Sequence, residues 1–185
     1  SGVLSTHDWP SLLRLCRTTV VMDAGRIIDA GLTSEVVGRY LAQEPPNHPC
    51  ASLLVPKRID LDNVRDLAFE FAVNVTESLN LEVAWSIELF SEDRGWESLI
   101  VENFHSLDTA PGHNQIDVTY EGTRLTSGTY MLNVFLRAMK DEGPPVGVDA
   151  VSWLYGNGSV LNVTGDSLPT PLTISNFQLC GRFLA

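Results

Sequence analysis

Thr123-Arg-Leu-Thr-Ser-Gly-Thr-Tyr-Met-Leu-Asn-Val-Phe-Leu-Arg137 is the stretch that decides the fold of this 185-residue chain. It opens with a turn built on Ser127 and Gly128, after which apolar and mixed positions alternate strictly. Tyr130, Leu132, Val134 and Leu136 fall on one face, and Met131, Asn133, Phe135 and Arg137 fall on the other. Alternation with a period of two, in a run rich in aromatic and β-branched residues, predicts a half-buried β-strand.

The rest of residues 51–185 repeats this pattern and shows no convincing helical periodicity. We expect strands at residues 53–61, 66–76, 79–90, 98–104, 115–120, 129–139, 146–155, 160–163 and 172–183. Polar, Gly-rich or Pro-rich turns separate these runs, as at residues 142–145 and 157–158. Such a series predicts a mainly β fold, a two-sheet antiparallel β-sandwich of Ig-like or jelly-roll type. Trp85 falls in an apolar set that is expected to form the core between the sheets.

The N-terminal part of the chain, residues 1–42, has the pattern of a short α/β segment. We expect a helix at about residues 9–16, a hairpin of residues 18–23 and 26–30, and a second helix at residues 33–41. Thr33 or Ser34 can cap the second helix. Residues 43–50 contain three prolines and predict an extended linker in which His48 is exposed to solvent.

Composition limits the classes of partner. The net charge is −11, and residues 50–185 carry eight of the basic and eighteen of the acidic residues. An acidic domain lacks the positive surface that nucleic acid or anionic lipid requires. The three cysteines have no spacing typical of a metal site, and no apolar run is long enough to enter a membrane as a helix. We therefore expect no metal, no nucleic acid and no direct membrane insertion.

A series of short motifs in residues 1–42 resembles the end of an ABC-transporter ATPase domain. The motifs are Ser5-Thr6-His7-Asp8, Leu15-Cys16-Arg17, Val21-Met22-Asp23-Ala24-Gly25-Arg26-Ile27, Asp29-Ala30-Gly31, Glu35-Val36-Val37 and Tyr40. The resemblance implies that His7 corresponds to the switch histidine, which contacts the γ-phosphate of ATP.

The phosphate-binding loop of that family is missing. Gly-x-x-x-x-Gly-Lys-Ser/Thr occurs nowhere in the chain, and neither does the ABC signature or the acidic strand that positions magnesium. We therefore expect this chain to bind no cofactor and to hydrolyse no ATP. The resemblance implies that ATP and Mg²⁺ belong to a longer protein of which this is the C-terminal part.

A second resemblance covers residues 51–185. Arg124-Leu125-Thr126-Ser127-Gly128-Thr129-Tyr130, Val134-Phe135-Leu136 and Asp149-Ala150-Val151-Ser152-Trp153 resemble the C-terminal carbohydrate-binding domain of O-antigen exporter ATPases, the Wzt family. The resemblance implies non-catalytic recognition of the finished end of a lipid-linked O-polysaccharide. It also implies a transmembrane exporter subunit as partner, and a cytoplasmic location on the inner membrane of a Gram-negative bacterium.

Sugar recognition needs aromatic rings and planar polar side chains that converge on an open sheet face. The residues that fit this need are Phe135, Arg137, Trp153, Asn133, Tyr155, Glu88 and Asn74. The alternative is a solvated face with a few stray aromatic residues, or a dimer contact. Arg137 could clamp an acidic or phosphate cap on the polymer, or it could pair with Glu70 or Glu88 on a neighbouring strand.

Two other functions stay open. One is a dimerisation or regulatory domain that does not bind glycan, and the other is a glycoside hydrolase that uses Glu70 and Glu88 as its carboxylate pair. We also expect a homodimer, because ABC ATPases work in pairs and residues 172–185 form a terminal strand that two protomers can exchange.

Overall fold

The computed structural model describes residues 2–6, 12–13, 15–41, 46–62, 66–77, 79–91, 95–120 and 125–165. His7, the expected strand at residues 172–183 and residues 43–45 of the expected linker lie outside this part of the chain. The elements in chain order are β1 (Thr18–Asp23), β2 (Arg26–Leu32), α2 (Thr33–Leu41), β3 (Ala51–Leu54), β4 (Arg58–Asp62), β5 (Leu67–Val75), β6 (Leu81–Ser91), β7 (Gly95–Leu107), β8 (Gly112–Tyr120), β9 (Gly128–Ala138), β10 (Val146–Val151), the 3₁₀ turn η1 (Trp153–Tyr155) and β11 (Ser159–Thr164).

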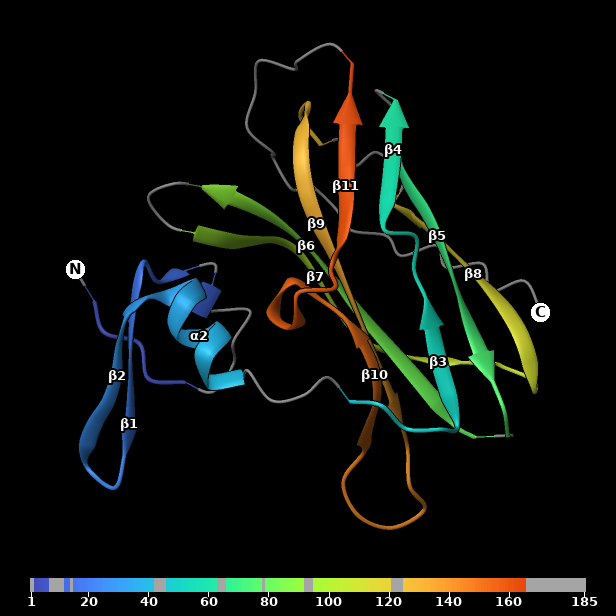
Figure 1. The fold of residues 1–185 in the computed structure, drawn as a ribbon, viewed down its shortest axis with the longest axis horizontal. Coiled ribbons are helices and arrows are strands. Elements are labelled where there is room, and N and C mark those ends of the chain that lie inside the picture. Colours follow the sequence, from blue (N-terminus) through green and yellow to red (C-terminus); the bar gives the residue numbers. More distant parts are fainter. Residues whose placement is uncertain are drawn as a thin grey trace.

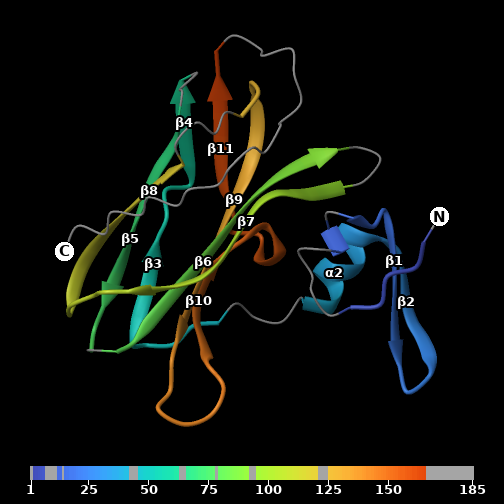
Figure 2. The ribbon, with the colours of Figure 1, turned by 180° about the vertical axis from the view of Figure 1, so that it is seen from behind.

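Strands β3 to β11 form the two-layer β-sandwich that the sequence predicts. One sheet has the strand order β4-β11-β9-β6-β7 with β10 added beside β9, and the other has the order β3-β5-β8. Every pair is antiparallel except β4 with β11, which is parallel. Figures 1 and 2 show the small sheet covering one face of the large sheet, with the N-terminal hairpin and α2 to one side.

Strand β9 lies at the centre of the larger sheet, with neighbouring strands on both of its edges. On one edge it pairs with β6, where Arg137 lies opposite Glu82 and Phe135 lies opposite Ala84. The other edge is divided between β10 and β11, which the turn η1 connects. Tyr130, Leu132, Val134 and Leu136 are all buried on the inner face of β9.

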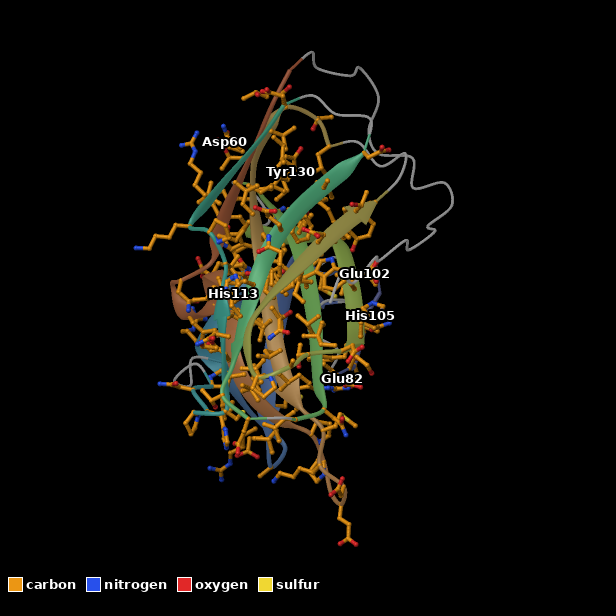
Figure 3. All side chains as sticks on the ribbon, turned by 90° about the vertical axis from the view of Figure 1, so that its right-hand side faces the viewer. Asp60, Glu82, Glu102, His105, His113 and Tyr130 are labelled. Atoms are coloured by element: carbon orange, nitrogen blue, oxygen red, sulfur yellow. The ribbon has the colours of Figure 1, made fainter. Side chains whose placement is uncertain are left out.

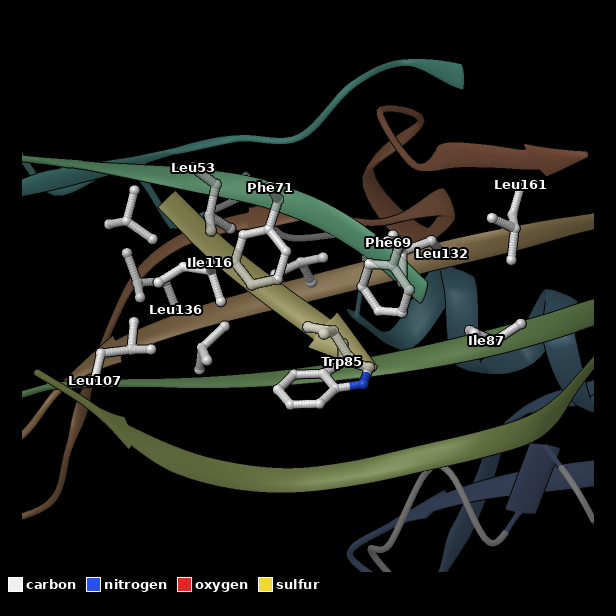
Figure 4. Packing of buried hydrophobic residues seen from close by; sticks show 14 of the residues in the cluster. Leu53, Phe69, Phe71, Trp85, Ile87, Leu107, Ile116, Leu132, Leu136 and Leu161 are labelled. Carbon is white, nitrogen blue, oxygen red and sulfur yellow. The ribbon is translucent and has the colours of Figure 1, made fainter. Parts of the chain in front are cut away.

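The hydrophobic core fills the space between the two sheets. The apolar residues at alternate positions of β5 and β6 point into it, and Trp85 is only 3% exposed, which confirms its assignment to the core. Figure 4 shows Phe69 and Phe71 of the small sheet above Trp85 of the large sheet. At about 25 cal/mol per Å² of apolar surface, this burial is the main source of stability.

The sequence prediction of one strand at residues 53–61 is wrong. β3 ends at Leu54 in the small sheet, and β4 begins at Arg58 in the large sheet, so the chain changes sheets between them. Pro56 lies at the change, and it cannot donate a ladder hydrogen bond. The proline was the signal in the sequence that the run is interrupted.

The expected strand at residues 146–155 is also shorter than predicted. β10 ends at Val151, and Trp153–Tyr155 form a 3₁₀ turn. The Ser152 hydroxyl accepts a hydrogen bond from the Leu154 N–H, and Gly156 closes the turn with a left-handed φ of 73°. Local capping of this kind competes with continuation of the ladder.

The N-terminal segment contains the predicted hairpin of β1 and β2, followed by α2. Its turn places Ala24 and Gly25 at positive φ, and Arg39 of α2 pairs with Asp29 of β2 at 2.9 Å. The last residues of the expected linker run along β10, because the His48 N–H donates to the Val148 carbonyl at 2.8 Å. His48 is exposed, as predicted.

Candidate functional site

The outer face of the large sheet carries most of the residues that the sequence analysis selected. Asn133, Phe135 and Arg137 project from it on β9, and Glu88 projects from β6. Trp153 and Tyr155 belong to η1 rather than to a strand. Asn74 is exposed on β5, in the other sheet, so it does not belong to the same surface.

Arg137 and Glu82 form an ion pair on this face. The Nε and Nη2 atoms of Arg137 lie 2.7 and 2.6 Å from Oε2 of Glu82. Direct register between β6 and β9 brings the two side chains together, so the expected pairing of Arg137 with Glu70 or Glu88 is wrong. Both contacts use one carboxylate oxygen. This leaves Nη1 of Arg137 and Oε1 of Glu82 without a partner among the described residues.

An aromatic ring lies under the Arg137 guanidinium. The Cζ atom of Arg137 is 3.7 Å from the ring centroid of Phe104 on β7, which is a cation–π contact. Phe104 is 37% exposed, so part of its surface stays open to solvent. Figure 3 shows where Glu82 lies, below Glu102 and His105 of β7. A partly open ring, a guanidinium and a carboxylate therefore meet at this point.

Phe135 extends the apolar part of this surface. It is partly buried on the outer face of β9, and the small residue Ala84 lies opposite it on β6. The pairing of β6 with β7 has a bulge between Val83 and Trp85. These two residues lie opposite His105 and Glu102, so the bulge is next to Phe104. We call Glu82, Phe104, Phe135 and Arg137 the outer-face cluster.

Glu88 lies deeper in the same face, beneath η1, and is only 4% exposed. Its Oε1 atom accepts hydrogen bonds from the hydroxyls of Ser86 and Ser98, each at 3.2 Å, and its Oε2 atom accepts one from the Trp153 indole N–H. Burial raises the pKa of Glu88, and the hydrogen bond from Trp153 is the strongest of the contacts that act against this effect.

Asn133 connects this buried group to the turn above it. Its Nδ2 atom donates to the Ser86 hydroxyl at 3.1 Å, and its Oδ1 atom accepts from the Trp153 backbone N–H at 3.0 Å. Asn133 is 1% exposed. Asn133 and Glu88 therefore hold η1 on the sheet, and the expectation that they lie on an open face for ligand contact is wrong.

Trp153 packs between two parts of the chain. Its ring stacks on Trp96 of β7 with centroids 5.8 Å apart, and Trp96 meets Phe90 edge to face. On another side the Trp153 ring lies close to Gly38 of α2, where an added Cβ would be 3.7 Å from it. These contacts occupy much of the Trp153 surface that a sugar would need.

The carboxylate pair proposed for glycoside hydrolysis is not assembled. Glu70 projects from the outer face of the small sheet, whereas Glu88 is buried on the outer face of the large sheet. The hydrophobic core lies between them. A hydrolase needs its two carboxyl groups to flank one bond, at separations of about 5–10 Å. The sequence cannot show which sheet a strand joins, and this is why the pair appeared plausible.

A groove that the sequence did not predict lies where β4 passes β5 and β8. Its volume is about 540 Å³, and six of its ten lining residues are apolar. The lining residues are Pro56, Arg58, Ile59, Leu61, Ala68, Phe69, Glu70, Asp117, Val118 and Thr119. Of these residues, the sequence predicts a role for Glu70 alone, and Pro56 is the local signal that the chain leaves one sheet for the other.

The described residues contain no group of three or more His, Cys, Asp or Glu side chains arranged to hold a metal ion. Within the same residues no helix has the length and apolar character needed to span a bilayer.

Comparison with known proteins finds similar solved structures. No family model and no curated protein matches the chain. Among the solved structures, the crystal structure of the C-terminal domain of Wzt is similar, with 14% sequence identity and a TM-score of 0.43. The similarity covers 63% of this chain and 74% of that one. A likeness of this extent carries no information about ligand or activity.

Proposed function

We propose that the chain is a non-catalytic recognition module that binds the end of a lipid-linked O-polysaccharide for an ABC exporter. The observation that carries this proposal is the outer-face cluster, in which Arg137 lies on the Phe104 ring and pairs with Glu82. The two resemblances in the sequence, an ATPase tail followed by a sandwich domain, supply the transport context.

The cluster has the chemistry that a terminal sugar requires. One face of a pyranose ring is lined by C–H groups, which pack on aromatic rings such as Phe104 and Phe135. Its hydroxyls can accept from Nη1 of Arg137 and donate to Oε1 of Glu82, the two atoms that the ion pair leaves unused. The ion pair also holds both side chains in place, which reduces the entropy lost on binding.

The charge of the chain limits the type of polymer. With a net charge of −11, the protein repels a polyanion. A largely neutral polysaccharide fits this charge, with any negative group confined to the end that meets Arg137. In this proposal the chain acts as a homodimer together with a transmembrane subunit, on the cytoplasmic side of the inner membrane.

The test is binding of the native polysaccharide to folded variants by isothermal titration calorimetry. Phe104→Ala, Phe135→Ala and Arg137→Ala should each weaken binding about fivefold or more, which corresponds to the loss of about 1 kcal/mol or more. Arg39→Ala is the matched control, because Arg39 also pairs with a carboxylate but lies on α2. Binding by all three variants at the parent affinity would rule out the outer-face cluster.

A further inference from the structure

The groove beside β4 exists because the chain changes sheets at Pro56. β3 pairs with β5 only over Ala72–Val75, and β4 then joins β11 in the large sheet. Residues 67–71 form the other half of β5. Along the edge that faces β3, this half pairs with no strand among the described residues. The space of about 540 Å³ that results is within the range of small-molecule sites, about 300–1,000 Å³.

The walls of the groove combine apolar and polar groups. Pro56, Ile59 and Leu61, together with Ala68 of the small sheet, supply the apolar part. The polar part comes from Arg58, Glu70, Asp117 and Thr119. An apolar surface edged by a few polar side chains suits a ligand that has both C–H faces and hydrogen-bonding groups.

Glu70 and Asp117 determine which ligand fits. They lie directly opposite each other in the antiparallel β5–β8 pair, and neither has a hydrogen-bond or ion-pair partner in the described residues. Two like charges in this position destabilise a sheet. The groove also contains Arg58, but its guanidinium is held by Asp60 at 2.8 Å. The groove therefore offers two carboxylates as hydrogen-bond acceptors, beside the Thr119 hydroxyl and the Nη atoms of Arg58.

We propose that this groove is a second glycan site, which binds one neutral hexose unit of the polymer. This second site rests on the proposed function. The outer-face cluster holds the terminal sugar, and the groove binds a hexose unit farther along the same polymer. Vicinal hydroxyls donate to the carboxylates of Glu70 and Asp117, and the sugar's C–H face packs on Ile59 and Leu61. Two carboxylates against one guanidinium give the groove a net negative charge, which disfavours acidic and phosphorylated sugars. Contacts on both layers of the sandwich make the interaction bivalent. Bivalent binding raises the overall affinity for the polymer even when the affinity of each single site stays the same.

The test follows amide resonances of the whole 185-residue chain by NMR. The probes are methyl pyranosides of glucose, galactose, mannose and N-acetylglucosamine at millimolar concentration, with glucuronic acid as the charged comparison. We expect at least one neutral glycoside, and not glucuronic acid, to shift the resonances of residues 68–70 and 117–119. Asp117→Asn and Glu70→Gln should each weaken this binding about tenfold, as expected when a charge-assisted hydrogen bond is lost.

Controls separate this proposal from the previous one. Glu77→Gln changes an exposed acid outside the groove and should have no effect. Arg137→Ala should weaken binding of the native polymer but leave the shifts in the groove unchanged, so the two sites can fail independently.

Three outcomes overturn the proposal. The first is that no neutral glycoside shifts the groove resonances. The second is that calcium chloride alone shifts them and Asp117→Asn abolishes the effect, which makes the groove a cation site. The third is that these resonances move with protein concentration in the absence of sugar, which means that another copy of the chain occupies the groove.

Discussion

Substitution of Glu88 tests how much the buried carboxyl group beneath Trp153 contributes to the free energy of unfolding. In the Glu88→Gln variant the amide oxygen can accept from the Trp153 indole N–H, and the amide nitrogen can donate to the hydroxyls of Ser86 and Ser98. All three contacts are therefore kept, and the charge is removed. In the Glu88→Ala variant the hydroxyls can rotate toward other partners, but the indole N–H loses its acceptor.

The two variants should differ strongly in stability. An unsatisfied buried donor costs about 1–3 kcal/mol, and the lost methylene adds about 0.8 kcal/mol, so Glu88→Ala should lose about 2–4 kcal/mol at pH 5.5. For a chain of this size each kcal/mol lowers Tm by about 2–4 °C, which gives a decrease of about 4–16 °C. Glu88→Gln should remain close to the parent or exceed it.

The comparison with Glu88→Gln also has a defined pH dependence. Burial raises the pKa of Glu88, so the folded protein keeps this proton at pH values where the unfolded chain has released it. In that window the folded state binds more protons, and the unfolding free energy falls as pH rises. The advantage of Glu88→Gln over the parent should therefore grow from the ordinary glutamate pKa upward and level off above the raised pKa.

Urea denaturation of the parent and both variants between pH 5.5 and 8 measures these differences. The reasoning is refuted if Glu88→Gln is as unstable as Glu88→Ala, because the cost would then not come from the orphaned indole N–H. A difference between Glu88→Gln and the parent that shrinks with rising pH would contradict the direction of the pKa shift.

Two further predictions concern stability at other positions. Gly158→Ala should lower the free energy of unfolding by about 1–3 kcal/mol through overpacking. An added Cβ would lie 2.6 Å from Met131 Sδ and 2.7 Å from the Trp153 backbone nitrogen. A Tm within about 1 °C of the parent would contradict this. Asp149→Ala should lower the unfolding free energy by about 1–3 kcal/mol, because the Asp149 carboxylate accepts the Leu53 N–H at 2.7 Å and so joins the two sheets. Chemical denaturation measures the second change, and an unchanged midpoint would show that water replaces the carboxylate.

The strand pattern, the core and the N-terminal hairpin could be predicted from local sequence. The alternation of Leu132 and Val134 with Asn133 assigns each residue to a face, because successive side chains in a strand point in opposite directions. In the same way, the hairpin depends only on a short turn that Ala24 and Gly25 can adopt. Such features need no information about distant residues.

The partners of the polar residues were decided by the tertiary structure alone. Periodicity shows that Arg137 lies on the outer face, but only the β6–β9 register puts Glu82 beside it instead of Glu70 or Glu88. Glu88 appears in the sequence as an ordinary surface glutamate, and it becomes buried because η1 folds back over it.

The groove beside β4 likewise requires strands from both sheets, since its walls come together only when the chain leaves one sheet for the other. A local pattern fixes how a residue is oriented within its own strand, because that depends on neighbouring backbone geometry. Which strands become neighbours depends on the packing of the whole core, and so the pairings that build a binding site are set by the fold.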